Sequence, residues 1–237
     1  MASSGWLQGR VEHLNRLNVF PVPDGDTGTN LHLTMEAVIK EIRGVPTNSA
    51  GAVARAAAHG ALIGARGNSG VIFSQLLRGV GEVVGSATSF DAADLARAFA
   101  RGMELAYSCV SNPVEGTILT VSKEVARAAE EAVREGADLV DTMRAAVAAA
   151  NATVQRTPEL LPILRQVGVV DAGGLGLLFI LEGVHRFITG AAEPAPVQPQ
   201  AVEPVSVSSS QDAFGYCTEF LLRGSNLAVE AIRQRLG

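Results

Sequence analysis

Apolar residues recur at helical spacing through most of the first 190 residues of the chain. Leu95, Phe99 and Met103 follow one another at steps of four residues, and Val121 and Val125 repeat this spacing. Such spacing is typical of helices with one buried face. It predicts about eight helices, over residues 32–42, 49–65, 69–84, 91–106, 121–135, 138–150, 157–168 and 173–188. We therefore expect an all-α fold for this part of the chain.

Polar residues, prolines and glycines mark where these helices begin and end. Ser89 or Asp91 suits the N-cap of the helix that follows them, and Gly136 suits a C-terminal stop. Thr157 followed by Pro158 predicts an N-cap with proline at the first helical position. We therefore expect a new helix to begin at that point.

The character of the sequence changes after Gly190. Residues 191–211 combine Pro, Val, Ser and Gln without any period, which predicts a flexible linker. Residues 212–237 contain one predicted strand, FGYCTEFLLR, and one predicted helix, NLAVEAIRQRLG. One strand and one helix cannot form a core, so we expect a helical domain over 1–190, followed by a linker and the truncated start of a second domain.

The composition excludes two broad classes of protein. The chain has 19 Lys and Arg, 24 Asp and Glu and a net charge of −5, with no basic cluster for nucleic acid. The longest apolar run, AGGLGLLFIL, is about half the length that spans a bilayer, so it predicts a buried core helix. Charged residues near the N-terminus do not fit a signal peptide, and Cys109 and Cys217 do not suggest a disulfide framework. We expect a cytoplasmic protein without a transmembrane segment.

The segment NVFPVPDGDTGTN, residues 18–30, places Asp24 and Asp26 close together on a stiff loop. Two such carboxylates repel one another unless a cation lies between them, and oxygen ligands suit Mg²⁺ or Ca²⁺. Thr27, Thr29 and Asn30 add neutral polar groups at the start of a helix, where an anion is favoured. The structural alternative is a turn in which the Asp side chains cap backbone N–H groups.

A second polar loop, GARGNSG, covers residues 64–70 and precedes a strongly apolar helix. Its glycines expose the backbone around Asn68 and Ser69, and Gly70 follows directly. Backbone N–H groups and a Ser hydroxyl at a helix start are typical of a phosphate-binding loop. A plain glycine-rich connection between helices is the alternative.

Two further loops break the helical pattern. In NPVEGTILTV, Gly116 and Thr117 precede Ile118, a polar-to-apolar step that suits the edge of a flat base. In GVVDAGGLG, Asp171 precedes Gly173 at a helix start, where the carboxylate could cap N–H groups or reach a ribose hydroxyl. For each loop alone, a purely structural role is the alternative.

Together these segments resemble a known family. LNVFPVPDGDTGTN, GARGNSGVIFSQ, PVEGTILTV, VGVVDAGGLGL and GYCTEFLLR resemble, in this order, the A subunits of bacterial fatty acid kinases. The N-terminal domain of those subunits belongs with the DhaL nucleotide-binding subunits of dihydroxyacetone kinases. The resemblance covers residues 6–190 and resumes at 214. It implies an antiparallel barrel of eight helices that binds ATP or ADP at one end through two Mg²⁺ ions.

The resemblance also assigns residues. Asp24 and Asp26 match the magnesium-binding, catalytic aspartates, and Asn18 stands where DhaL proteins supply a third aspartate. Asn18 can offer a carbonyl oxygen to a metal but no charge. The nucleotide-binding positions that the resemblance and the loops indicate are Thr27, Thr29, Asn30, Asn68, Ser69, Gly70, Gly116, Thr117, Ile118, Asp171 and Gly173.

The function implied is ATP-dependent phosphorylation of a fatty acid, which a separate fatty acid-binding partner protein presents, to an acyl phosphate. We expect this chain alone to be inactive in transfer, because the full-length kinase has further domains. No Cys or His follows Cys217, so we expect no zinc here although the next domain of the family looks zinc-binding. A dihydroxyacetone-type kinase subunit and a non-catalytic nucleotide-binding module stay open, as does a homodimer.

Overall fold

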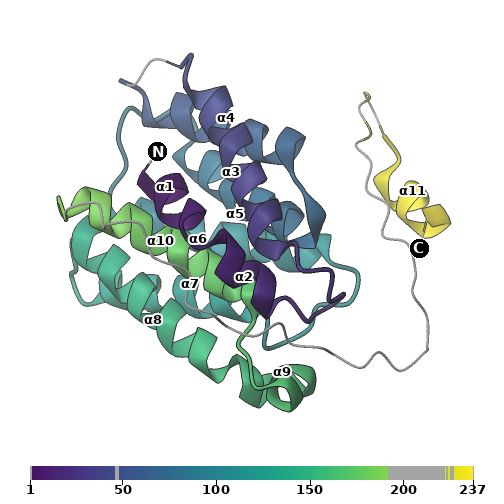
Figure 1. Ribbon diagram of the computed structural model, residues 1–237. Helices are drawn as coiled ribbons and strands as arrows, with labels where there is room; N and C mark the ends of the chain where they lie inside the picture. Colours follow the sequence, from purple (N-terminus) through teal and green to yellow (C-terminus); the bar gives the residue numbers. More distant parts are fainter. Residues whose placement is uncertain (1, 46–47, 192–221, 223, 225–226, 237) are drawn as a thin grey trace.

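The computed structural model describes residues 2–45, 48–191, 222, 224 and 227–236, and every regular element in these ranges is a helix. Figure 1 labels them α1 (Ala2–Gln8), α2 (Val11–Leu17), α3 (Thr27–Ile42), α4 (Ala50–Gly64), α5 (Gly67–Val84), α6 (Ala92–Cys109), α7 (Ile118–Arg134), α8 (Leu139–Leu160), α9 (Pro162–Val167), α10 (Ala172–Ile188) and α11 (Val229–Leu236). The all-α prediction is confirmed.

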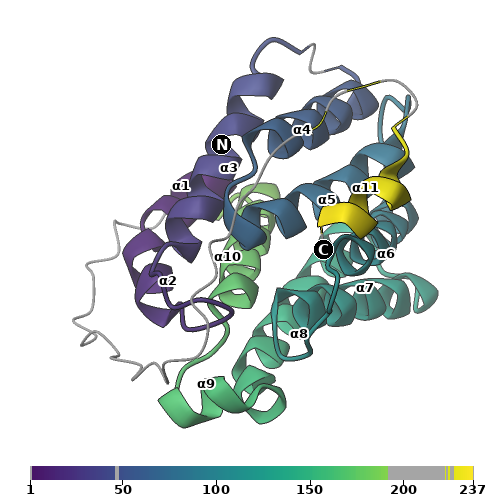
Figure 2. The same cartoon turned by 90° about the vertical axis from the view of Figure 1, so that its right-hand side faces the viewer.

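The long helices form a barrel in which each helix packs against the next one in the chain. This holds for α3 through α8, after which α10 packs against α8 and α7 (Figures 1 and 2). The short helices α1 and α2 close the barrel between α10 and α3. Within the described residues, the wall of the barrel therefore has eight parts, namely the α1–α2 pair, the six helices α3 to α8, and α10. The family resemblance implied this eight-helix barrel.

One predicted helix is wrong. No helix begins at Thr157, because α8 continues through Thr157 and Pro158, and the next helix begins instead at Pro162. Pro158 has no N–H to donate to the carbonyl of Val154, one turn earlier. The Thr157 hydroxyl replaces it and donates to Val154 O at 2.7 Å. The α1–α2 pair therefore takes the eighth place in the wall of the barrel, and the hydrophobic periodicity did not predict these two helices.

The other end signals lie where the sequence placed them. Asp91, and not Ser89, caps α6. Its carboxylate accepts a hydrogen bond from the Asp94 N–H at 2.8 Å, and the Asp94 carboxylate accepts one from the Asp91 N–H at 3.1 Å. This reciprocal pair is a capping box. Gly136 follows α7 with a φ of +86°, which a glycine adopts without strain.

Several side-chain contacts hold α1 against α10, the last helix of the barrel. Trp6 donates its indole N–H to Glu182 at 2.9 Å, and the guanidinium carbons of Arg10 and Arg186 lie 3.5 and 4.5 Å from the Trp6 ring centroid. Cation–π contacts of this kind stabilise by about 0.5–1 kcal/mol each at exposed sites. α1 is too short to be stable alone, so these contacts and its apolar packing hold it in place.

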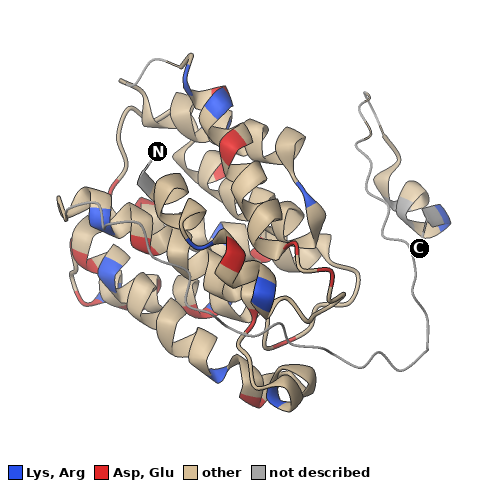
Figure 3. Cartoon of the chain, in the orientation of Figure 1, with Lys and Arg blue, Asp and Glu red and all other residues tan. Residues whose placement is uncertain are grey.

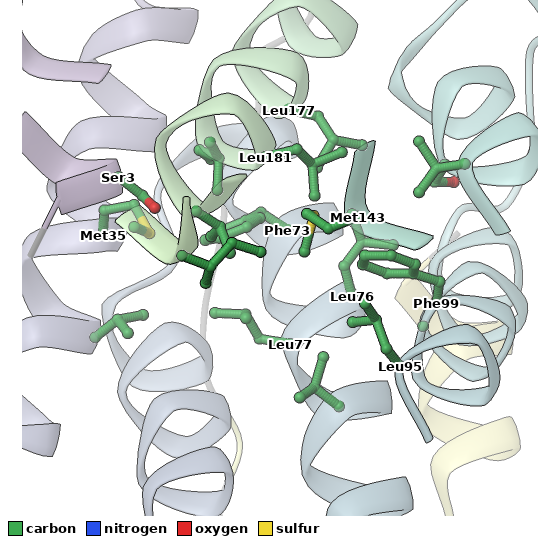
Figure 4. A pocket seen from close by; sticks show the side chains of 18 of the residues that line it. Ser3, Met35, Phe73, Leu76, Leu77, Leu95, Phe99, Met143, Leu177 and Leu181 are labelled. Carbon is green, nitrogen blue, oxygen red and sulfur yellow. The ribbon is translucent and has the colours of Figure 1, made fainter. Parts of the chain in front are cut away.

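An apolar cavity of about 270 Å³ lies among the helices of the barrel (Figure 4). Side chains from α1, α3, α5, α6, α7, α8 and α10 line it, among them Ser3, Met35, Phe73, Leu76, Leu77, Leu95, Phe99, Met143, Leu177 and Leu181. The helix predicted from AGGLGLLFIL is buried in this core as α10, as expected.

The charged residues and the hydropathy of the helices can be followed over the described part of the chain. Figure 3 shows the described Lys and Arg residues scattered over several helices, without a basic cluster. Among the described helices, none is both long and apolar enough to cross a membrane. The predicted linker after Ala191, nearly all of the predicted strand and Cys217 lie outside the described residues, whereas the predicted final helix is present as α11.

Candidate nucleotide and metal site

Four helices begin beside a pair of adjoining cavities at one end of the barrel. The smaller cavity, of about 290 Å³, and the larger, of about 390 Å³, share Phe20, Pro21, Thr27, Asn68 and Ser69 as lining residues. Their walls include the first residues of α3, α5, α7 and α10. The N-terminus of a helix carries a partial positive charge, so this arrangement favours an anion.

The smaller cavity contains the two aspartates of the opening loop. Burial, followed by the negative charge of Asp26, raises the pKa of Asp24 above its ordinary value. In the described part of the chain, no Lys, Arg or His forms an ion pair with either carboxylate. Asp26 precedes α3 but its side chain makes no capping hydrogen bond, whereas the Asp24 carboxylate accepts from the backbone N–H groups of Asp24 and Asp26. Two unneutralised carboxylates facing one cavity fit a hard cation.

Asn18 holds the start of α3 next to these aspartates. Its Oδ1 accepts hydrogen bonds from the Thr27 N–H at 3.1 Å and from the Thr27 hydroxyl, and its Nδ2 donates to Val22 O at 2.6 Å. Asn18 is only 7% exposed, although it lines the smaller cavity. Asn18 therefore fixes both the loop and the first residue of the helix.

Asn15, one turn earlier on α2, holds the same helix by a second pair of bonds. Its Oδ1 accepts from the Thr29 N–H at 3.1 Å and its Nδ2 donates to the Thr29 hydroxyl at 3.0 Å. This pairing turns Thr29 toward α2, and Thr29 lines neither cavity. Sequence reasoning missed Asn15, because only its contact with a helix twelve residues later reveals a role.

The start of α5 supplies polar groups to both cavities. Its N-cap residue, Arg66, makes no side-chain capping bond, and the first bond within the helix runs from Gly70 N to Arg66 O at 3.0 Å. The N–H groups of Gly67, Asn68 and Ser69 precede that bond and have no partner within the helix. The N-terminus of α5 is therefore suited to phosphate oxygens.

Gly70 itself lines neither cavity. A Cβ atom at this position would lie 2.5 Å from the hydroxyl oxygen of Thr34, so only glycine fits. The Thr34 hydroxyl also accepts from the Arg66 N–H at 3.2 Å. Gly70 thus sets the approach of α5 to α3 and brings Asn68 and Ser69 to the cavities.

The larger cavity brings Thr117, Ile118, Asp171 and Gly173 together. Asp171 is 5% exposed and its carboxylate accepts from the Gly174 N–H at 2.7 Å and from the backbone of Ile118. One carboxylate therefore caps α10 and also binds the start of α7. Burial, opposed in part by these two bonds, raises its pKa to about 6. Of the two roles considered for Asp171, the structure shows the cap.

Gly116 lies behind this cavity and does not line it. Its φ is +85°, and a Cβ atom would lie 2.8 Å from the Cβ of Leu161. Its N–H donates to the Thr120 hydroxyl at 2.8 Å, and that hydroxyl donates to Glu115 at 2.7 Å. Gly116 therefore permits the tight turn that presents Thr117 and Ile118.

The predicted site residues thus separate into two groups. Those that line one or both cavities are Asn18, Asp24, Asp26, Thr27, Asn30, Asn68, Ser69, Thr117, Ile118, Asp171 and Gly173. Thr29, Gly70 and Gly116 lie outside the lining, where they contact the elements that do line it. Cys109 at the end of α6 also lines the larger cavity, which the sequence did not indicate.

The DAK2 domain matches residues 21–186, which include the whole site except Asn18 and Phe20. The chain belongs to the DAK2 domain family. Protein YloV of Bacillus subtilis is 41% identical over 234 residues, which is 94% of this chain and 42% of YloV. Protein SH1689 of Staphylococcus haemolyticus is 40% identical over 226 residues, 92% of this chain and 41% of that protein. The chain therefore spans less than half the length of these relatives.

Solved structures show the same helical fold. The dihydroxyacetone kinase of C. freundii in complex with AMP-PNP and Mg²⁺ superposes with a TM-score of 0.56 at 20% identity. It matches 78% of this chain and 32% of that kinase. The native form of the same enzyme gives a TM-score of 0.58 at 17% identity. At this identity the likeness establishes the fold.

Proposed function

We propose that this DAK2 domain is the ATP- and Mg²⁺-binding domain of a cytoplasmic kinase that phosphorylates the carboxylate of a fatty acid. The observation that carries the proposal is the joined pair of cavities. It has two carboxylates at one end, an uncapped helix N-terminus between, and largely apolar walls at the other end. These parts suit, in order, the metal, the phosphates and the base of a nucleotide.

Charge supports a metal at the aspartates. Among the described residues that line the two cavities, none is Lys, Arg or His. Polyphosphate placed beside Asp24 and Asp26 would meet only like charge, apart from the dipoles of the helix N-termini. Mg²⁺ is commonly held by one or two carboxylates together with substrate phosphates, so the donor set fits it. Bound beside the aspartates, Mg²⁺ would neutralise the negative charge of the phosphates. We propose two ions, because this is the number that the family resemblance implies.

The residues of the chain then have distinct roles. Asp24 and Asp26 hold the metal, while the N–H groups of Asn68 and Ser69 bind phosphate oxygens. Asn30 completes the phosphate end, Thr27 lines both cavities where they adjoin, and Thr117, Ile118 and Gly173 surround the nucleoside. Asp171 keeps the starts of α7 and α10 together.

A carboxylate acceptor is consistent with this site because it requires no general base in the cavity walls. A hydroxyl acceptor has to lose a proton during phosphoryl transfer, whereas a fatty acid is already ionised at neutral pH. In the proposed reaction, a carboxylate oxygen forms the new P–O bond and the bond from the γ-phosphorus to the bridging oxygen of ADP breaks. The products are an acyl phosphate and ADP. A separate acyl-binding protein would present the fatty acid, as the resemblance implies.

The first test is calorimetric titration of this chain with ADP and with ATP, each with and without Mg²⁺. The proposal requires nucleotide binding that Mg²⁺ strengthens by at least about tenfold, or 1.4 kcal/mol. Binding that is absent, or equal with and without Mg²⁺, would overturn it.

The second test concerns transfer. The full-length protein, mixed with an acyl-loaded partner and labelled ATP, should form a hydroxylamine-sensitive acyl phosphate, whereas this chain alone should bind nucleotide without transfer. Phosphorylation of dihydroxyacetone by the full-length protein would favour the dihydroxyacetone-type alternative. Tight nucleotide binding without transfer to either acceptor would favour a non-catalytic module.

A further inference from the structure

The hydrogen bonds of Thr27 determine what its hydroxyl can offer to a ligand. A Thr hydroxyl has one hydrogen to donate and two lone pairs. In this structure the Thr27 hydroxyl donates its hydrogen to Asn18 Oδ1. Thr27 is 6% exposed and lines both cavities. Its hydroxyl oxygen therefore keeps free lone pairs but has no hydrogen left to donate, in a residue that lines both cavities.

Asn18 is in the opposite situation. An amide oxygen has two lone pairs, and the N–H and the hydroxyl of Thr27 use both of them. The amide nitrogen is held by Val22 O at 2.6 Å, so the side chain cannot turn over without losing these bonds. Asn18 therefore has no lone pair left for a metal ion.

The aspartates leave most positions around a magnesium ion unfilled. Mg²⁺ takes six oxygen ligands in octahedral geometry. Within the described ranges, no group of three or more His, Cys, Asp or Glu side chains could hold a metal. Further protein ligands must therefore be neutral oxygens, and a Ser or Thr hydroxyl has that role in P-loop proteins.

We propose that Thr27 is a neutral oxygen ligand of the metal ion, and that Asn18 is a positioning residue that orients Thr27 and stays outside the ligand shell. The inference rests on the proposed function and revises the expectation that Asn18 itself is the third ligand. The direction of the hydrogen bond supplies the reason: a hydroxyl that has given its hydrogen to Asn18 can accept a cation but cannot donate to phosphate.

The chain offers a matched control in Thr29. Thr29 is paired with Asn15 through its N–H and hydroxyl, as Thr27 is paired with Asn18, but Thr29 lies outside both cavities. Thr27→Val and Thr29→Val each remove one hydroxyl from the same helical turn with little change of volume. Any general loosening of this turn should therefore affect both variants, whereas loss of a metal ligand affects only Thr27→Val.

The experiment measures ADP affinity by calorimetry with and without Mg²⁺ for the wild type and both variants, with apo melting temperatures as a check on folding. We expect Thr27→Val to lose about tenfold or more of the Mg²⁺-dependent affinity while its Mg²⁺-free affinity stays unchanged. Thr29→Val should keep the Mg²⁺ dependence of the wild type. Thr27→Ser retains the hydroxyl, so it should restore most of the lost affinity and guards against a folding defect.

Two Asn18 variants test its positioning role. Asn18→Ala should reduce the Mg²⁺-dependent affinity about 10–100-fold, and combining it with Thr27→Val should add little, because both changes remove the same oriented oxygen. Asn18→Asp should bring no gain, whereas a direct ligand would bind Mg²⁺ more tightly with the added charge.

The outcomes separate the inference from the function on which it rests. If the wild type shows no Mg²⁺-dependent binding, both fail. If the wild type shows it but Thr27→Val behaves like Thr29→Val, or Asn18→Asp strengthens Mg²⁺ binding, the inference is overturned and the proposed function stands.

Discussion

The hydroxyl of Thr157 connects the end of α8 to the start of α10 by accepting the N–H of Asp171 at 3.0 Å. The same hydroxyl donates to the carbonyl of Val154, which Pro158 leaves without its usual partner. Thr157 and Asp171 are 0% and 5% exposed, so water cannot replace either bond. A single buried hydroxyl thus repairs the proline interruption and positions the residue that caps α10.

Replacement of Thr157 by Val should therefore destabilise the domain strongly. The variant leaves one buried carbonyl and one buried N–H unpaired, each costing about 1–3 kcal/mol. We expect the free energy of unfolding, measured by urea titration, to fall by about 2–5 kcal/mol. Thr157→Ser keeps the hydroxyl and loses one methyl group, so it should cost only about 1 kcal/mol.

Pro158 provides an internal check on that explanation. Pro158→Ala restores an N–H that can bond Val154 O, so it should recover about 1 kcal/mol in the Thr157→Val background. In the wild-type background it should recover nothing, because the Thr157 hydroxyl already holds that carbonyl. Equal effects in both backgrounds would contradict the repair role of Thr157.

The second prediction concerns the opening loop. Asp24→Asn and Asp26→Asn each remove a full charge but keep the size and hydrogen-bonding shape of the side chain. ADP affinity in the presence of Mg²⁺ should fall at least about tenfold and lose most of its Mg²⁺ dependence. The apo melting temperature should stay equal or rise, since without metal the two carboxylates repel one another. Unchanged affinity in both variants would refute the metal assignment.

The third prediction is a pH dependence that originates from Asp171. Its folded-state pKa is raised to about 6 from 3.8, so the folded protein holds this proton more tightly than the unfolded chain. Its contribution to stability is therefore present below about pH 4 and is lost as the pH rises through about 6. The stability of the wild type relative to Asp171→Asn should fall by about 2–3 kcal/mol across this window.

Taking the difference between the two proteins cancels the titration of all other groups. Urea titrations of both at pH 4, 5, 6 and 7 provide the measurement. A stability difference that is constant, or that grows with pH, would show that Asp171 is not a buried carboxyl with a raised pKa.

The fourth prediction compares two glycines with nearly the same backbone conformation. Gly116 and Gly136 have φ values of +85° and +86°, but only Gly116 has Leu160 and Leu161 packed where a Cβ atom would lie. Gly136→Ala should cost about 1–2 kcal/mol from backbone strain alone. Gly116→Ala should cost about 1–3 kcal/mol more because of the clash, and should also weaken nucleotide binding. Equal losses of stability would mean that the clash relaxes freely.

The sequence predicted the long helices because their stability depends on features that are local along the chain. Asp91, Asp138 and Gly136 act within a few residues, so their chemistry can be recognised without the fold. Thr157 shows the limit of that reasoning. Threonine before proline is typical of an N-cap, and only the free carbonyl of Val154 and the N–H of Asp171 explain why the helix continues instead.

The helices α1 and α2 and the role of Asn15 could not be predicted for a related reason. Helices of seven residues are unstable alone, and tertiary contacts such as that of Trp6 with Glu182 decide whether they form. At the site, residue type identified the loops, and the cavities contain most of the residues they indicated. The direction in which Thr29 points was not predictable, because Asn15 on another helix determines it.

The barrel is closed by contacts between its first helix, α1, and its last helix, α10, which has a consequence for folding during synthesis. α1 packs against α10, and Gly183 leaves room for the backbone of Ser3. When the chain has been synthesised only as far as Leu160, every helix in the wall of the barrel except α10 has been made. Asp171 and Gly173 are also still missing at that point. The nascent chain therefore cannot complete the larger cavity before the start of α10 has been made.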